Sequence, residues 1–247
     1  MFFKKHNMKK KSLAAKKIIH KSLLNYLKNS RIKSIFKGYT IHLDKFIKKN
    51  DNLAVGISGG PDSLALAYLT KCYLIKNKLS SKFFIVDHGL RKESSKEAKS
   101  VKQLLAKFDI VCEILKWKGK KPKSNILSIA RNERYKLLKT ACKKKKIKHL
   151  LIGHHLDDLY ENFFIRLLRG SGLKGLSSFG EPIKEENNFF ILRPLIKYNK
   201  EDLVYISKLV FNFFIKDPSN EDSSFLRSRI RKLIVDLNNQ GLDKKKL

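Results

Sequence analysis

The stretch that decides the fold is SGGPDS, at residues 58–63. It separates a short apolar run at 53–57 from a helical pattern that begins at Leu64. Glycines let a backbone turn tightly and approach a ligand, and proline suits the first turn of a helix. Free N–H groups and the helix dipole at such a turn attract phosphate. The stretch therefore predicts a strand, a phosphate-binding loop and a helix in succession.

Apolar runs and helical patterns alternate on the carboxyl side of residue 51. The expected strands are 53–57, 83–86, 111–115, 149–152 and 189–192, and the expected helices are 63–76, 95–108, 124–144 and 157–168. Short apolar strands separated by helices are typical of a parallel sheet that is covered on both faces. We expect a doubly wound α/β domain with a mainly parallel, five-stranded sheet, which binds ligands at the carboxyl ends of its strands.

Three segments are expected along the chain. Residues 1–37 form a basic N-terminal extension, residues 38–195 the α/β domain, and residues 196–247 a small helical C-terminal lobe. The extension is unusual because residues 1–50 hold 15 Lys or Arg and a single acid, Asp44. An amphipathic helix is expected over Ala14–Leu27, with Ile18, Ile19, Leu23, Leu24 and Leu27 on one side. A solvated tail, an RNA-contacting arm and a transit peptide are the three interpretations, and the scarcity of Arg ranks the transit peptide last.

The charge of the chain is strongly positive. Lys and Arg number 55 against 22 Asp and Glu, which gives a formal net charge of +33. Such a surface attracts polyanions, and nucleic acid is the first candidate. A Lys-rich coding bias is the alternative, because only ten of the 55 cations are Arg.

The cysteines and the hydropathy point to a compartment. Cys72, Cys112 and Cys142 form no C-x-x-C pair, which argues against a zinc site, an iron–sulfur site and a disulfide framework. No apolar stretch approaches the length of a membrane span, and no signal-peptide pattern opens the sequence. A soluble, cytoplasmic protein is expected.

Polar residues follow two of the expected strands. Asp87 and His88 follow the second strand, where they could contact an adenine or a ribose. The fourth strand runs into GHHLDD at 153–158, and Asp158 and Glu161 are three residues apart, on one side of the next helix. Histidines and carboxylates could bind a metal, or the carboxylates could hold the ammonium groups of a cationic substrate.

Arginines supply candidate phosphate contacts. Arg131 and Arg134 share one helix face and could clamp phosphates in a fork geometry. A glycine-rich loop follows the acids, and alternating arginines lie near the carboxyl end of the chain. The cations of these two segments are Arg166, Arg169, Lys174, Arg227, Arg229 and Arg231.

The loop SGGPDS resembles the pyrophosphate loop of the ATP-pyrophosphatase (PP-loop) superfamily, whose fold is adenine-nucleotide alpha-hydrolase-like. Over roughly 39–234 the ordered motifs resemble the tRNA(Ile)-lysidine synthase family. The motifs are 58–63, DHGLR at 87–91, ARNERY at 130–135, HHLDD at 154–158, RGSG at 169–172, RPL at 193–195 and DPSN at 217–220.

The resemblance implies a ligase that uses ATP and Mg²⁺. In that reaction ATP adenylates the C2 oxygen of the wobble cytidine in tRNA(Ile) with the anticodon CAU. The ε-amine of free lysine then attacks C2 and expels AMP, which leaves lysidine and changes decoding from AUG to AUA. The oligomeric state is left open, and a homodimer is compatible with the resemblance.

The resemblance also implies roles for residues. ATP would be bound by Ser58, Gly59, Gly60, Pro61, Asp62, Ser63, Asp87 and His88, with Asp62 also holding Mg²⁺. Arg131 and Arg134 would stabilise charge on the α-phosphate, and Asp158 and Glu161 would bind lysine. The cations of the loop and the C-terminal segment would contact tRNA. The proton of the lysine amine would go to His154 or Asp157, or desolvation would lower the pKa of the amine.

Three other functions compete with this one. A tRNA thiolase of the same superfamily would need a cysteine pair, and the sequence has none. GMP or NAD synthetases need an ammonia source and do not account for the charge. A non-enzymatic RNA-binding protein with a degenerate loop is distinguished by its failure to incorporate lysine into tRNA.

Overall fold

The computed structural model describes residues 2–119, 122, 124–172, 182–215 and 226–242, without the side chains of 2–12 and 127. Its elements, in chain order, are α1 (Phe2–Asn25), η1 (Tyr26–Lys28), α2 (Ser30–Asp44), β1 (Asn52–Ile57), α3 (Pro61–Asn77), β2 (Ser80–Asp87), α4 (Ser94–Ala106), β3 (Cys112–Lys116), α5 (Ile126–Lys144), β4 (His149–Leu151), α6 (Leu156–Leu168), β5 (Ile183–Glu185), η2 (Glu186–Asn188), β6 (Phe189–Leu192), α8 (Lys200–Phe211) and α9 (Leu226–Asn239).

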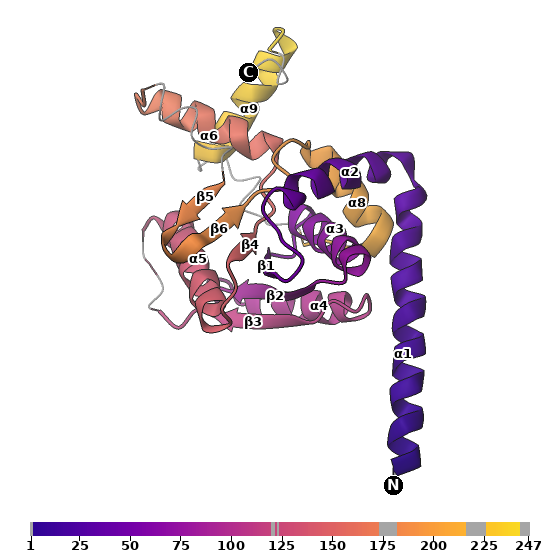
Figure 1. Cartoon of the computed structure of the whole chain (residues 1–247). Coiled ribbons are helices and arrows are strands. Elements are labelled where there is room, and N and C mark those ends of the chain that lie inside the picture. Colours follow the sequence, from indigo (N-terminus) through magenta and orange to yellow (C-terminus); the bar gives the residue numbers. More distant parts are fainter. Residues whose placement is uncertain (1, 120–121, 123, 173–181, 216–225, 243–247) are drawn as a thin grey trace.

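One sheet organises the molecule (Figure 1). Its strand order is β3-β2-β1-β4-β6-β5, and all neighbours are parallel except β5 and β6. The predicted doubly wound α/β fold is confirmed, but the sheet has six strands, and not five, in the described residues. The prediction missed β5 because this edge strand is only three residues long and largely exposed, so it carries no apolar run.

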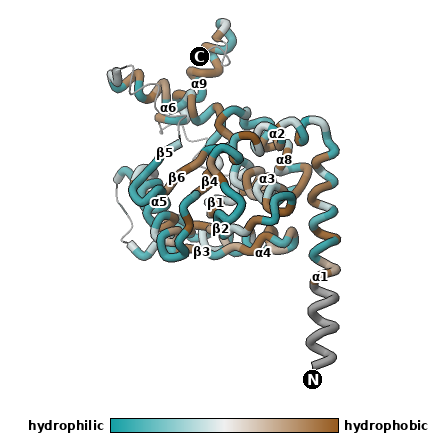
Figure 2. The backbone as a smooth tube through the Cα atoms, in the orientation of Figure 1, coloured by the Kyte–Doolittle hydropathy of each residue, from teal (hydrophilic) through white to brown (hydrophobic). Residues whose placement is uncertain are grey.

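Side chains of successive strand residues enter two cores, as the pleat requires. Leu53, Val55 and Ile57 of β1 face α3 and α4, whereas Ala54 lies in a second cluster with Leu138 of α5. The sheet is therefore buried on both faces. Figure 2 shows the hydrophobic residues concentrated on the central strands and on α3.

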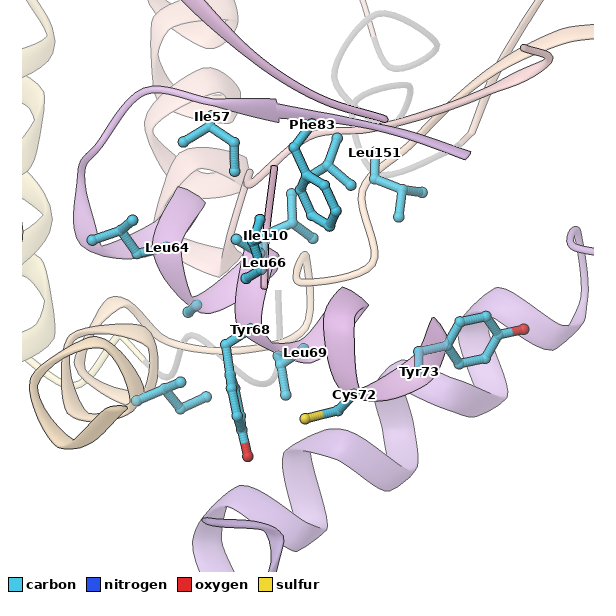
Figure 3. Packing of buried hydrophobic residues seen from close by; sticks show 14 of the residues in the cluster. Ile57, Leu64, Leu66, Tyr68, Leu69, Cys72, Tyr73, Phe83, Ile110 and Leu151 are labelled. Atoms are coloured by element: carbon cyan, nitrogen blue, oxygen red, sulfur yellow. The ribbon is translucent and has the colours of Figure 1, made fainter. Parts of the chain in front are cut away.

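Helix α3 is the centre of the larger core. It is apolar around most of its circumference because the sheet covers one side, while α8, α2 and the end of α1 cover the other. Figure 3 shows Leu64, Leu66 and Leu69 of this helix, which belong to the same hydrophobic cluster as the strand residues Ile57 and Phe83. The helix that follows the SGGPDS loop is thus held rigidly in place.

The N-terminal segment differs in detail from the expected amphipathic helix. Helix α1 ends at Asn25, and a 3₁₀ turn follows it. Leu23 and Leu27 are buried as expected, but Ile18 is 70% exposed, because α1 meets the body only near its carboxyl end (Figure 1). The boundary expected at residue 37 falls inside α2, which contributes buried residues to the main core.

The C-terminal segment contains two helices in the described part of the chain. Helix α8 packs on α3. Helix α9 packs on α6 through Tyr160, Ile230 and Ile234, so this pair stands at one edge of the sheet (Figure 1). Among the described residues, no helix is long and apolar enough to cross a bilayer.

Candidate active site

The strand order reverses between β1 and β4, which are parallel neighbours. In open α/β sheets the crevice beyond the carboxyl ends of strands at such a switch point is the usual ligand site. The SGGPDS loop leaves β1 and the GHHLDD segment leaves β4, so both enter this crevice. They touch at Gly153, where a Cβ atom would lie 3.1 Å from the carbonyl oxygen of Asp62.

The side chain of Ser63 holds the SGGPDS loop together. Its hydroxyl oxygen accepts the amides of Ser58 (3.1 Å) and Gly59 (3.0 Å), and the hydroxyl donates to the carbonyl of Gly60 (2.9 Å). Ser207 of α8 adds a hydrogen bond to the carbonyl of Pro61. The loop is thereby fixed before any ligand arrives, and the first-turn amides of α3 have no partners within the helix.

Gly59 has a left-handed backbone that other residues adopt poorly. Its φ is +87°, and a Cβ atom there would lie 2.8 Å from both Ile215 and Val101. The amide of Ile215 donates to the carbonyl of Gly59 at 2.9 Å. The chain that leaves α8 therefore clamps the loop from outside.

We expect Gly59→Ala to destabilise the fold by about 1–3 kcal/mol, because the new methyl group meets both backbone strain and close contacts. Gly60→Ala is the matched control, since its Cβ atom would approach nothing closer than 3.8 Å. Urea denaturation of both variants measures the difference. Equal stabilities would contradict the described loop geometry.

Asp62 begins α3 and faces the crevice. Its Oδ1 is buried and has no hydrogen-bond partner among the described residues, and its Oδ2 lies 3.7 Å from Nε2 of His155. Burial raises the pKa of Asp62 to about 6. Among the described residues, no three His, Cys, Asp or Glu side chains converge on a common metal position. One orphaned carboxylate oxygen next to a phosphate loop suits Mg²⁺, which takes one or two carboxylates together with phosphate oxygens.

The Asp62 carboxyl gives a stability prediction. Its pKa is about 6 in the fold against an ordinary value of 3.8, so the ionised form is penalised and wild type loses stability as pH rises from about 4 to 6. Asp62→Asn lacks this penalty. We expect it to be more stable than wild type by about 2–3 kcal/mol at pH 7, and similar at pH 4. Denaturation at the two pH values tests this, and no pH-dependent difference would contradict it.

The acids after β4 are organised around His155. This imidazole is buried, with Nε2 3.5 Å from Oδ2 of Asp158 and Nδ1 3.5 Å from Oδ2 of Asp157. Burial alone would lower the pKa of His155, but the three carboxylates, that of Asp62 included, raise it above its ordinary value. Burial alone would raise the pKa of Asp158. The charge of His155 and the hydrogen bond from its backbone amide bring the pKa of Asp158 below its ordinary value instead. Asp158 is therefore an ionised acid beside the loop.

His155 thus connects the two motifs. Its Nε2 lies within 3.7 Å of both the Asp62 and the Asp158 carboxylates. The SGGPDS loop and the acids that follow β4 therefore share one crevice, at the carboxyl ends of β1 and β4.

Glu161 has a partner that was not expected. Its buried carboxylate accepts two hydrogen bonds from Arg231 of α9. Burial and Arg131 lower the pKa of Arg227, which also lies near the Asp158 and Glu161 carboxylates. In a helix, alternate residues do not share a face. Arg227 and Arg231 therefore turn toward the crevice, whereas Arg229 is exposed.

A second cluster surrounds His154. Nε of Arg193 donates to its Nδ1 at 3.1 Å, and a guanidinium nitrogen of Arg131 lies 3.4 Å from its Nε2. Burial, followed by these cations, lowers the pKa of His154 to about 3. His154 is therefore neutral and a weak proton acceptor.

The residues after β2 form a third group. The Asp87 carboxylate accepts the Gly89 amide and the Ser95 hydroxyl, so it shapes the loop. Nε of Arg134 donates to Nε2 of His88 at 3.4 Å. Burial, followed by the Arg134 charge, lowers the pKa of His88 to about 4. Arg131 and Arg134 thus contact different histidines rather than forming one fork.

The remaining predicted residues lie away from these clusters. Arg166 is in the last turn of α6, and the exposed Arg169 follows that helix. Lys174 and the DPSN motif at 217–220 lie outside the described residues.

A pocket of about 530 Å³ adjoins the acids, between α6, α8 and α9. Its walls combine carboxylates, cations and apolar side chains. They include Asp157, Glu161, Lys200, Tyr205, Arg231 and Ile234. Such walls can hold an aliphatic chain that carries charged ends.

Three residues that the structure places at the site had no expected role, and a fourth, His155, was considered only as a possible metal ligand. Arg193 is the first polar residue after β6, so the rule of strand ends could have found it. His155 belongs to the HHLDD motif, but only the structure shows that it lies against Asp62, Asp157 and Asp158. Ser207 and Ile215 gave no signal, because their contacts depend on how α8 packs on α3.

The fold and the site at the carboxyl ends of β1 and β4 define a nucleotide-binding α/β domain. The sequence profile of the PP-loop domain matches residues 24–238, so the chain belongs to the PP-loop family.

The relatives are named tRNA(Ile)-lysidine synthase. That of Orientia tsutsugamushi (strain Boryong) is 42% identical over 76% of this chain and 42% of its own length. That of Bradyrhizobium diazoefficiens is 36% identical over 81% and 56%, and that of Wolbachia pipientis wMel is 41% identical over 78% and 45%. The chain spans about half the length of these relatives.

A solved structure has the same fold. The U34-tRNA thiolase NcsA from Methanococcus maripaludis, determined with its [4Fe-4S] cluster, has a TM-score of 0.76 at 22% identity. The similarity covers 89% of this chain and 76% of that one. At this identity the similarity concerns the fold alone.

Proposed function

We propose that this protein joins free lysine to C2 of the wobble cytidine of tRNA(Ile) with anticodon CAU, at the expense of ATP, in the cytoplasm. The names of the relatives support this reaction. The observation that carries the proposal is the His155 contact, which puts an ionised acid and a phosphate loop in one crevice.

In the first step, the C2 oxygen of cytidine attacks the α-phosphate and pyrophosphate leaves. The loop at 58–63 binds the departing pyrophosphate through the free amides at the start of α3. Mg²⁺, held by Asp62, would neutralise phosphate charge when bound. Arg131, which lies 3.4 Å from His154, would stabilise the negative charge that develops on the α-phosphate.

In the second step, the ε-amine of lysine attacks C2, and the C2–O bond breaks to release AMP. Asp158 binds the ε-ammonium group of lysine. The neighbouring pocket takes the butyl chain and the carboxylate end of lysine. The amine has a pKa of about 10.4 in water and must lose a proton. Because the pKa of His154 is about 3, this histidine accepts the proton poorly. Two routes remain for the loss of this proton: transfer to Asp157, or desolvation of the amine, which lowers the pKa of the amine.

Glu161 takes part indirectly in this proposal. Its carboxylate already binds Arg231, so lysine either displaces that guanidinium or binds Asp158 alone. The contact ties α9, with its tRNA-facing Arg229, to the lysine pocket.

A thiolase function lacks support in the described residues. Cys72, Cys112 and Cys142 are all buried, and Cys142 lies in a different core cluster from the other two. Burial raises the pKa of each thiol to about 12. Such thiols are inert and cannot bind one cluster together.

The test is incubation of the protein with labelled lysine, ATP and total tRNA. We expect label in a single tRNA species, dependent on ATP, with one AMP and one pyrophosphate released per lysine. Pyrophosphate release without lysine incorporation, under any lysine concentration, would contradict the proposal.

A further inference from the structure

Helix α1 is attached to the body at only one end. Leu23 and Leu27 are buried, and the Tyr68 hydroxyl donates to the carbonyl of Leu23. By contrast, the six residues 13–18 are all exposed, including Leu13 at 59% and Ile18 at 70%. None of these six side chains is buried, although Lys16 reaches Asp109 of the body.

A charged cluster fixes the direction of the attached end. Asp109 lies 2.8 Å from Nε2 of His20, 2.8 Å from Nζ of Lys71 and 3.7 Å from Nζ of Lys16. Despite burial, the hydrogen bonds from Lys71 and His20 and the charges of Lys71 and Lys16 lower the pKa of Asp109, which is therefore ionised. The anchor contacts α1 at Lys16 and His20, and the helix meets the body only near its carboxyl end (Figure 1).

The composition of α1 is strongly one-sided in charge. The helix contains no acid, and its eight lysines are at positions 4, 5, 9, 10, 11, 16, 17 and 21. At 3.6 residues per turn these positions are distributed around the whole helix axis. Among the lysines of α1 whose side chains the structure describes, only Lys16 has an acidic partner.

The apolar residues of α1 form no stripe. Leu13 and Ile18, both exposed, lie about 140° apart around the axis. A helix that lies on a membrane or docks into a protein groove needs a continuous apolar face. An unpacked helix is also marginal in water by itself. The chemistry that complements a cationic rod of this kind is a polyanion.

We propose that α1 is a docking helix for the phosphate backbone of the tRNA substrate, outside the anticodon. The identity of the RNA rests on the proposed function, but the contact itself is sequence-independent. Residues 2–23 lie outside the region that matches the PP-loop profile. This chain therefore carries an RNA-binding element of its own in addition to the crevice.

The test compares two variants from which the same charge is removed. The first is K5Q/K9Q/K10Q/K11Q, which leaves the Asp109 anchor intact. The control is K143Q/K144Q/K146Q/K148Q, whose lysines are exposed at the end of α5 and in the turn before β4. Binding of unmodified tRNA is measured from 50 to 300 mM salt, together with anionic phosphatidylserine vesicles.

We expect the α1 variant to bind tRNA at least ten-fold more weakly at 0.15 M salt. Its slope of log K against log salt should be shallower by about 0.9 for each phosphate that the helix no longer neutralises. The control should bind within three-fold of wild type. Equal weakening in both variants would overturn the inference, as would vesicle binding that depends on α1 while tRNA binding does not.

The binding assay separates this inference from the proposed function, because it needs no turnover. If lysine is never incorporated but tRNA binding depends on α1, the docking role stands and the reaction is wrong. If lysine is incorporated and the α1 variant binds tRNA like the control, only the docking role fails.

Discussion

Replacing Asp62 by Asn should reduce adenylation of the tRNA by about 10³-fold or more, which is the scale for removing a group that stabilises transition-state charge. In the part of the chain that the structure describes, the carboxylate oxygen Oδ1 is buried without a hydrogen-bond partner at the start of α3, where the phosphates of ATP would lie. An amide keeps the shape of the side chain but cannot supply the negative charge that Mg²⁺ requires.

The measurement is single-turnover release of pyrophosphate with tRNA and without lysine. The increased stability of Asp62→Asn at pH 7 is the control for folding, since a misfolded variant would lose stability and activity together. Pyrophosphate release within ten-fold of wild type would rule out Asp62 as the metal ligand.

Replacing Asp158 by Asn should separate the two steps. The carboxylate is nearly buried and ionised, so in the proposed reaction its removal leaves the ammonium of lysine without a charged partner. A desolvated charge pair that loses one partner costs about 3–5 kcal/mol. We therefore expect the KM for lysine to rise by about 10²-fold or more, with adenylation of tRNA largely kept.

Two measurements check this prediction: lysine incorporation over a wide range of lysine concentrations, and accumulation of adenylated tRNA by mass spectrometry. Glu201→Gln is the matched control, because it removes one exposed acid from the wall of the same pocket. It should change the KM for lysine by less than three-fold. Equal reductions of adenylation and lysine incorporation in Asp158→Asn would contradict the assignment of Asp158 to lysine.

The sequence predicts the central part of this fold well because the relevant signals are local. The apolar run at 53–57, the two glycines and Pro61 specify a strand, a turn and a helix start without help from distant residues. The same holds for the run at 149–151 and the acids that follow it. Since parallel strands end at one edge, the meeting of both loops follows from the fold class.

The interactions that the sequence does not reveal depend on packing between distant segments. The Glu161–Arg231 pair requires α9 to lie on α6, and the clamp on Gly59 requires α8 to direct residue 215 over the loop. No local pattern carries that information. The expected apolar face of the first helix included Ile18 because periodicity cannot show that the body ends before α1 does.

The most direct test is a structure of the protein with a non-hydrolysable ATP analogue and free lysine. We expect the phosphates on the amides at the start of α3, and the ε-nitrogen of lysine within hydrogen-bond distance of Asp158 in the same crevice. Lysine in the cavity of about 590 Å³ lined by His20 and Lys71, at the other ends of the strands, would contradict the account.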